Sequence, residues 1–177
     1  MFALDAYRPD QWHDFFVMVG GGALVLTGLV FVALSLNLNV VTQDATHRYR
    51  AIDTLTAMTG VFVISALVLM GGQDHRAVGI EWLVVAAITT AVYLRGHVQA
   101  VRLSGSMSEL RPSRTVVAAV LYLAQLVGAA LLVADYIAGL YIAAVAMVAA
   151  LALMVSAAWL LVVGVTRREP NALDRSP

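Results

Sequence analysis

Histidine and carboxylate side chains are the groups of this chain that could bind a metal ion. The sequence has no cysteine, which excludes disulfides, thiolate metal sites and cysteine nucleophiles. Five residues that could ligate Zn²⁺ fall on one predicted side of a membrane: His13, Asp14, Asp74, His75 and Glu81. They come from separate segments and lack the HExxH spacing with which a single helix binds zinc. We therefore interpret them as anchoring and solvated residues at the membrane surface and predict no metal site.

Paired histidines are the other arrangement that could hold a cofactor, because imidazoles ligate haem iron. His13 with His75, or His47 with His97, would supply such pairs. All four lie at or beyond the predicted membrane edges rather than inside a helix bundle, so we predict no haem and no other cofactor. The sequence shows no nucleotide-binding fingerprint, phosphate-binding loop or Ser-His-Asp arrangement with usable spacing, and it favours a non-enzymatic role.

Asp53 is the ionisable residue with the most informative position. It directly precedes the uncharged run Thr54–Gln73, so its helix should carry it to the membrane edge. Arg95 ends a similar apolar run and should lie at comparable depth. Because an unpaired carboxylate is costly at that depth, we predict an ion pair between Asp53 and Arg95. A gate, or a docking site for acidic lipid headgroups, is the alternative for this basic face.

Polar side chains also fall inside the predicted membrane spans. They are Thr56, Thr59, Tyr122 and Gln125. Gln125 should face protein, because its amide would be costly in lipid without hydrogen-bond partners. We predict an interhelical hydrogen bond for it. The alternative is that this polar cluster lines a route for a solute.

Small residues recur along two of the predicted helices, where they would let helices approach closely. One row repeats every seven residues, and the other advances in alternating steps of four and three residues. The rows are Gly21, Gly28 and Ser35 in the first span, and Gly139, Ala143, Ala146 and Ala150 in the last. We expect both rows to pack inside the bundle; a pore-lining or dimerisation face is the alternative.

The elements that must position these residues are membrane-spanning helices. The chain is 61% hydrophobic and 12% charged, whereas a soluble domain is about 25% charged, so lipid must cover much of its surface. A span needs roughly 20 apolar residues. Five spans in one domain over residues 1–177 are predicted, at 15–38, 51–72, 77–97, 115–134 and 138–164. The fold class is therefore an all-α, polytopic transmembrane bundle.

Arginine placement predicts the orientation of these spans. All eleven basic residues are arginine, and Arg8 and Arg76 alone fall on the side that carries the N-terminus. Positive charge accumulates on the cytoplasmic side of membrane proteins, which predicts an N-out, C-in topology. Trp12 and Trp82 should then lie in the aromatic belt at the outer boundary.

Three stretches carry a resemblance to other proteins: Thr27–Leu38 (TGLVFVALSLNL), His47–Arg50 (HRYR) and Val61–Gln73 (VFVISALVLMGGQ). Over roughly residues 14–98 the chain resembles small uncharacterised integral membrane proteins of high-GC bacteria. The resemblance implies a multi-pass protein of the bacterial cytoplasmic membrane. It implies no activity, cofactor or site residue.

These observations favour a small non-enzymatic membrane scaffold or accessory subunit. Its expected partners are the lipid bilayer and either further copies of the chain or other membrane subunits. A net charge of zero argues against nucleic-acid binding. The alternative is a homo-oligomeric channel or transporter for a small solute, with Thr, Gln and Tyr side chains along the route. A membrane-embedded enzyme is the third interpretation.

Overall fold

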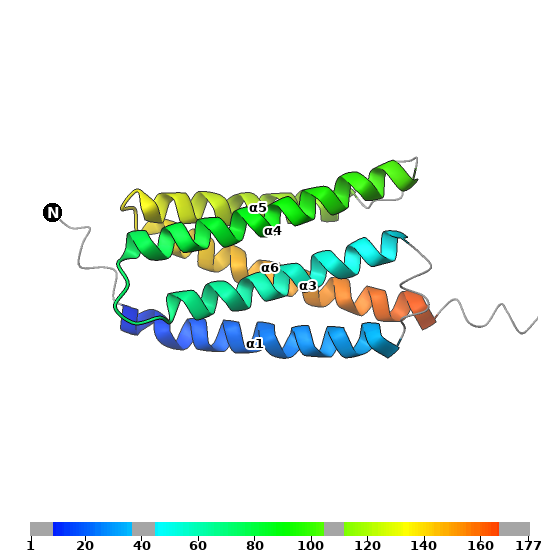
Figure 1. The fold of residues 1–177 in the computed structure, drawn as a ribbon, viewed down its shortest axis with the longest axis horizontal. Coiled ribbons are helices and arrows are strands. Elements are labelled where there is room, and N and C mark those ends of the chain that lie inside the picture. The colour runs from blue at the N-terminus through cyan, green and yellow to red at the C-terminus, as the bar shows by residue number, and fades with distance from the viewer. Residues whose placement is uncertain (1–8, 37–44, 105–111, 167–177) are drawn as a thin grey trace, which may run out of the picture.

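The protein is a bundle of long helices, which a computed structural model describes over residues 9–36, 45–104 and 112–166 (Figure 1). All five helices of the described residues are long and apolar enough to cross a membrane. They are α1 (Pro9–Leu36), α3 (Ala45–Val68), α4 (His75–Ser104), α5 (Pro112–Val133) and α6 (Ala138–Thr166). The predicted all-α fold with five spans is confirmed, including the third span, which contains Glu81.

Neighbouring helices run antiparallel and pack in chain order, and the last helix closes the bundle. α1 packs on α3, α3 on α4, α4 on α5 and α5 on α6, while α6 also contacts α3 and α1. The α3–α4 and α5–α6 connections lie at the same end (Figure 1), which we call the turn end. Arg102, near the C-terminus of α4, lies at the opposite end. The N-out orientation stays a prediction.

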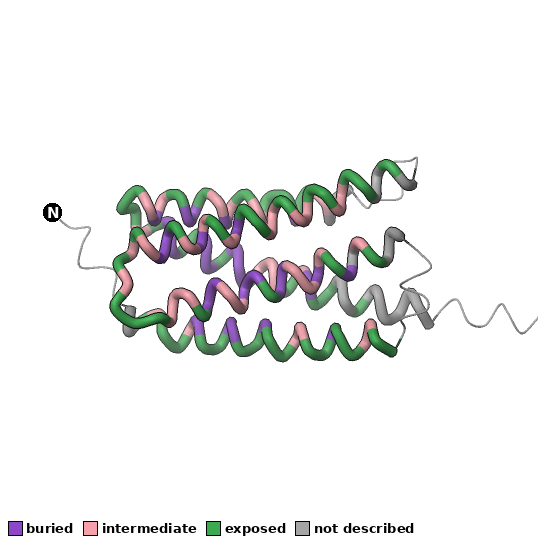
Figure 2. Tube along the Cα trace, viewed as in Figure 1, coloured by how far each residue is buried: buried purple, intermediate pink, exposed green. Residues whose placement is uncertain are grey.

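The core is apolar and lies where the helices face one another (Figure 2). Its largest fully buried side chains include Phe16, Met58, Trp82 and Met147. Large apolar side chains also cover the outside; Leu29 and Phe31, for example, are 62% and 63% exposed. Lipid can solvate such side chains, so an apolar exterior is the expected surface of a membrane bundle.

The predicted small-residue face of α6 lies inside the bundle. Gly139, Ala143 and Ala146 are buried, and Ala150 is partly buried. A Cβ atom at Gly128 of α5 would lie 2.7 Å from the Gly139 carbonyl oxygen and 2.8 Å from the Ala143 Cβ. The α5 and α6 backbones are therefore too close for a side chain at this crossing, as small residues in membrane helices permit.

The predicted small-residue row of α1 lies outside the bundle, which corrects the expectation of internal packing. Gly21, Gly28 and Ser35 are exposed, and a Cβ atom at either glycine would have none of the described residues within 4 Å. Gly20 faces the bundle instead, where its Cβ would lie 2.6 Å from the Ser65 Cβ. Because each residue turns a helix by about 100°, a seven-residue repeat places its members on one face of the helix. The repeat does not indicate whether that face points toward the bundle or toward lipid.

Candidate functional site

Asp53 contacts a tyrosine inside the membrane-spanning part of the bundle. It is the third residue of the apolar stretch Ala51–Val68 of α3, and its Oδ1 accepts a hydrogen bond from the Tyr122 hydroxyl at 3.3 Å. Tyr122 lies seven residues into the α5 stretch that begins at Thr115, about 10 Å along the helix axis. The Asp53 carboxyl group is thus bound by a hydroxyl supplied from within the membrane-spanning part of α5.

Two further rings extend this contact along α4. The Tyr93 ring lies 4.8 Å from the Tyr122 ring and 5.9 Å from the stacked His97 ring, centroid to centroid. The Tyr93 hydroxyl donates a hydrogen bond to the Thr115 carbonyl at 3.3 Å. Asp53, Tyr122, Tyr93 and His97 therefore form a continuous row, which we call the tyrosine row. It joins α3, α5 and α4.

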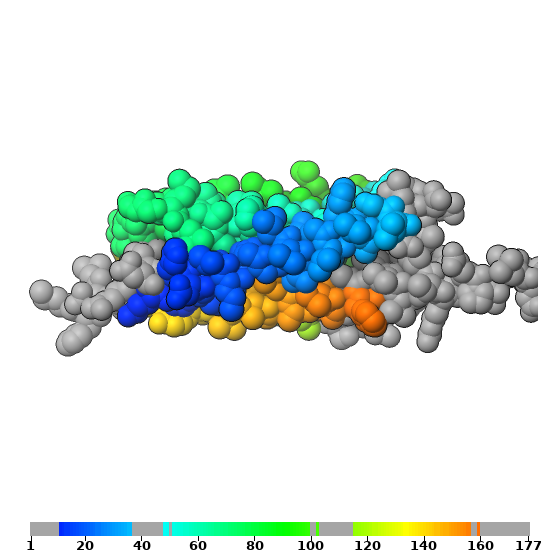
Figure 3. All heavy atoms as spheres, turned by 90° about the horizontal axis from the view of Figure 1, so that it is seen from below, coloured from blue at the N-terminus to red at the C-terminus, as the bar shows by residue number. Residues whose placement is uncertain are grey.

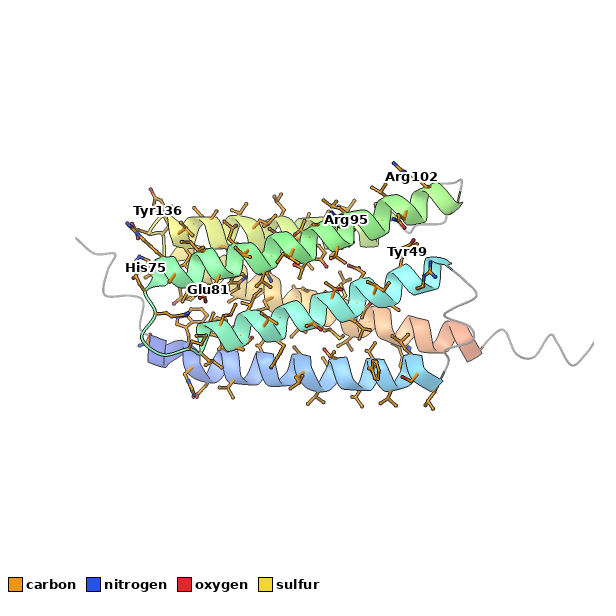
Figure 4. The ribbon with its side chains drawn as sticks, in the orientation of Figure 1. Tyr49, His75, Glu81, Arg95, Arg102 and Tyr136 are labelled. Atoms are coloured by element: carbon orange, nitrogen blue, oxygen red, sulfur yellow. The ribbon has the colours of Figure 1, made fainter. Side chains whose placement is uncertain are left out.

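The tyrosine row replaces the predicted pair of Asp53 with Arg95. Among the residues that the structure describes, Asp53 forms no ion pair, and the Arg95 side chain is exposed. Figure 4 shows Arg95 on α4, toward the end opposite His75. Arg95 is two positions from both Tyr93 and His97, a rotation of about 200° around the helix. The sequence indicated a similar depth for Asp53 and Arg95, but Arg95 points away from the face that α4 presents to α5.

Gln125 forms the predicted interhelical hydrogen bond, and its partner is Trp82. The indole Nε1 of Trp82 donates to Gln125 Oε1 at 2.7 Å, and both side chains are buried. Trp82 was predicted in the aromatic belt, so its position inside the core is a correction. It lies seven residues into α4, on the same face as Val78 and Ala86, which are also buried. That helical spacing was the sequence signal for a core position.

Of the predicted polar cluster, Tyr122 lines the same small cavity as Gln125, whereas the two threonines are not among the residues of its wall. Thr56 is partly buried and Thr59 is exposed. The cavity lies between α3, α4, α5 and α6, and the α3 residues that line it are Ala57, Gly60, Val61 and Ile64. The cavity measures about 30 Å³. This volume suits one or two water molecules and is far below that of a pocket for an organic ligand.

A second polar network ties the two turns together at the turn end. The His75 ring lies between two carboxylates, with Nδ1 2.7 Å from Asp74 Oδ1 and Nε2 2.6 Å from Asp135 Oδ1. Arg76 donates to both carboxylate oxygens of Asp135. Figure 4 shows His75 and Tyr136 at this same end of the bundle. The hydrogen bonds from Arg76, followed by the contact with His75, hold the pKa of Asp135 well below its usual range.

Comparison with protein families, curated proteins and solved structures found no match to this chain. The function must therefore be inferred from the tyrosine row, the cavity and the exposed surfaces.

The other candidate metal and haem ligands are His13, Asp14, Glu81 and His47. Within the described residues, no group of three or more histidine, aspartate or glutamate side chains could hold a metal. His13 and Asp14 are exposed on α1, and Glu81 accepts hydrogen bonds from Gln73 Nε2 at 3.0 Å. The side chain of His47 lies outside the described part of the chain.

Proposed function

We propose that this multi-pass protein is a non-enzymatic scaffold or accessory subunit of a bacterial cytoplasmic membrane, with its N-terminus outside. The exposed face of α1 is the observation that supports this proposal. Figure 3 shows α1 on the surface of the bundle, beside α6. The face is a candidate contact for a second copy or for another membrane subunit.

Large and small residues alternate along this face. Gly21, Gly28 and Ser35 alternate with Leu24 and Phe31, so that successive members are three or four residues apart. Leu24 is 52% exposed and Phe31 is 63% exposed. A spacing of three and four is the heptad pattern of helices that cross at a shallow angle, and small residues provide the hollows that a partner's side chains fill.

A partner helix accounts for the glycines of this face better than lipid does. A glycine inside a helix costs roughly 0.5–1 kcal/mol relative to alanine. At Gly21 and Gly28 none of the described residues comes near enough to require the missing side chain. Close approach of a second helix would use both positions, whereas lipid chains would contact alanine equally well.

Substitution on and off this face tests the proposal. Purification in native nanodiscs followed by mass spectrometry should recover the wild type as a homo-oligomer or with a foreign subunit. Gly28→Leu should release the chain as a monomer, because the side chain fills the hollow. Gly22→Leu is the matched control, since Gly22 is exposed on α1 but lies about 100° around the helix from Gly21 and outside the repeat. A monomeric wild type, or a Gly28→Leu variant that assembles normally, contradicts the proposal.

A channel or transporter for a small solute is the second candidate function. The tyrosine row favours it, because a carboxylate within a membrane span usually belongs to an ion or solute pathway. The cavity of about 30 Å³ limits any bound species to the size of water in this conformation. Liposomes with the purified protein should then show a flux of protons or small cations that Asp53→Asn abolishes. Equal flux for the wild type and the variant contradicts this second candidate.

A further inference from the structure

The orientation of the Gln125 amide is fixed by its partner. The indole N–H of Trp82 can only donate a hydrogen bond, so the atom that faces it must be the amide oxygen, as the 2.7 Å contact to Oε1 shows. The Gln125 Nε2 group therefore points elsewhere, with two N–H donors to satisfy. Gln125 itself is buried, because only 7% of the residue is exposed.

Gln125 Nε2 has no hydrogen-bond acceptor in the part of the chain that the structure describes. Among those residues, the one side-chain polar atom that is both sealed from water and without a partner is Gln73 Oε1. Gln125 Nε2 is therefore not sealed. Gln125 forms part of the wall of the cavity between α3, α4, α5 and α6, so the cavity is where a water molecule can reach its amide.

The cavity wall also offers hydrogen-bond acceptors. Thr89 lines it, and its hydroxyl donates to the Val85 and Ala86 carbonyls at 3.1 Å, which leaves oxygen lone pairs free. Tyr122 lines it too, and its hydroxyl proton is directed to Asp53. A buried water needs two to four polar partners, and cavities with only apolar walls stay dry. The residues of the wall thus include one amide and two hydroxyl groups.

We propose that this cavity is a water-binding site in the membrane interior, occupied by one or two molecules. The bound water accepts a hydrogen bond from Gln125 Nε2 and donates to the hydroxyl oxygen of Tyr122 or Thr89. Through Tyr122 it joins Gln125 to Asp53, so that a hydrogen-bonded line links α4, α5 and α3. The volume of about 30 Å³ excludes organic ligands from the site. This inference does not depend on the assembly role proposed for α1.

Water contacts of the Gln125 side-chain amide test the site directly. The chain has five glutamines, so the amide signal of an isotope-labelled sample in nanodiscs can be assigned by its loss in Gln125→Leu. We expect magnetisation transfer between water and the Gln125 amide in the wild type. Ala118→Leu should abolish that transfer while the amide signal remains, because Ala118 lines the cavity and a leucine side chain would fill it.

Ala119→Leu is the matched control, since Ala119 is the next residue of α5 and is exposed. It should leave the water transfer unchanged. A resolved Gln125 amide without water transfer in the wild type means that the cavity is dry and overturns the proposal. Transfer that persists in Ala118→Leu means that water reaches the amide by another route, and this result also overturns it. If Ala118→Leu does not fold, Ala118→Val provides the same comparison with a smaller side chain.

Discussion

Arg76, in the first turn of α4, forms a two-pronged ion pair with Asp135, which lies between α5 and α6. Arg76 Nε lies 2.9 Å from Asp135 Oδ1, and one of its terminal nitrogens contacts Oδ2. Asp135 adopts a φ of 67°, a left-handed conformation that aspartate and asparagine tolerate better than most residues. The pair therefore joins two turns that are separated in sequence and positions α4 against the α5–α6 hairpin outside the apolar core.

Asp135→Asn should destabilise the protein at neutral pH but not at low pH. Asparagine keeps the backbone conformation and removes the charge. Because the pKa of Asp135 is lowered in the folded protein, its stabilising contribution is complete above the unfolded-state carboxyl pKa of about 4. The contribution is lost as the pH falls through the folded-state value. Thermal unfolding in detergent across this pH range should show the two proteins converging, and a constant difference would contradict the assignment.

Gly139→Ala should destabilise the α5–α6 hairpin. The added Cβ would lie 2.7 Å from the Leu132 backbone nitrogen and 2.8 Å from the Leu131 Cβ, and backbone atoms cannot move aside cheaply. Overpacking of this kind costs roughly 1–3 kcal/mol. Gly96→Ala is the control, because a Cβ at Gly96 would have no atom of the described chain within 4 Å and alanine favours a helix. Unfolding midpoints in detergent measure both, and equal midpoints would place the close crossing elsewhere.

Asp53 and Tyr122 should act as a coupled pair, and Arg95 should act separately. Tyr122→Phe removes the hydroxyl that donates to Asp53, which should cost roughly 1 kcal/mol, the usual size of a hydrogen bond between membrane helices. Asp53→Leu combined with Tyr122→Phe should cost less than the sum of the single changes. Arg95→Ala combined with Asp53→Leu should be additive. Coupling between Asp53 and Arg95 instead would restore the ion pair predicted from the sequence.

The difference between these two partners of Asp53 shows what the sequence could and could not provide. Runs of uncharged residues predict how many helices cross the membrane and how deep Asp53 and Arg95 lie, because rise per residue is constant. The direction of each side chain around its helix depends on where the neighbouring helices pack. Hydrophobic residues on every side of a membrane helix hide that information. For this reason the predicted directions of the Arg95 side chain and of the small-residue row at Gly21 were wrong.

Three features were within reach of the sequence, and two of them were predicted. An amide such as Gln125 inside a span must find a partner wherever it points, and the hydrogen bond to Trp82 meets that requirement. The row from Gly139 to Ala150 faces the bundle because the tight turn before it forces α5 and α6 together. Trp82 could have been placed in the core by its spacing from Val78 and Ala86, but tryptophan is also typical of membrane boundaries.

The orientation of the bundle can be tested by cysteine labelling, because the chain has no cysteine of its own. We expect a membrane-impermeant maleimide added outside to modify Asp74→Cys, which lies at the turn end and is exposed. It should not modify Ser106→Cys, which follows α4, until the membrane is permeabilised. The physical reason is the excess of arginine on the cytoplasmic side of membrane proteins. Labelling of Ser106→Cys alone would reverse the proposed topology.

Trp82 and Gln125 should contribute to stability as a hydrogen-bonded unit in the core. Trp82→Phe leaves the Gln125 amide oxygen without its donor, and an unpaired buried polar group costs about 1–3 kcal/mol. Gln125→Leu in turn leaves the indole N–H of Trp82 without its acceptor. The double variant removes both polar groups, so it should lose less stability than the two single variants together. Trp159→Phe is the control for the aromatic change, because Trp159 is 68% exposed and should tolerate it. Reversible unfolding in detergent followed by tryptophan fluorescence gives all four values, and strictly additive losses would mean that the two side chains stabilise the bundle by packing alone.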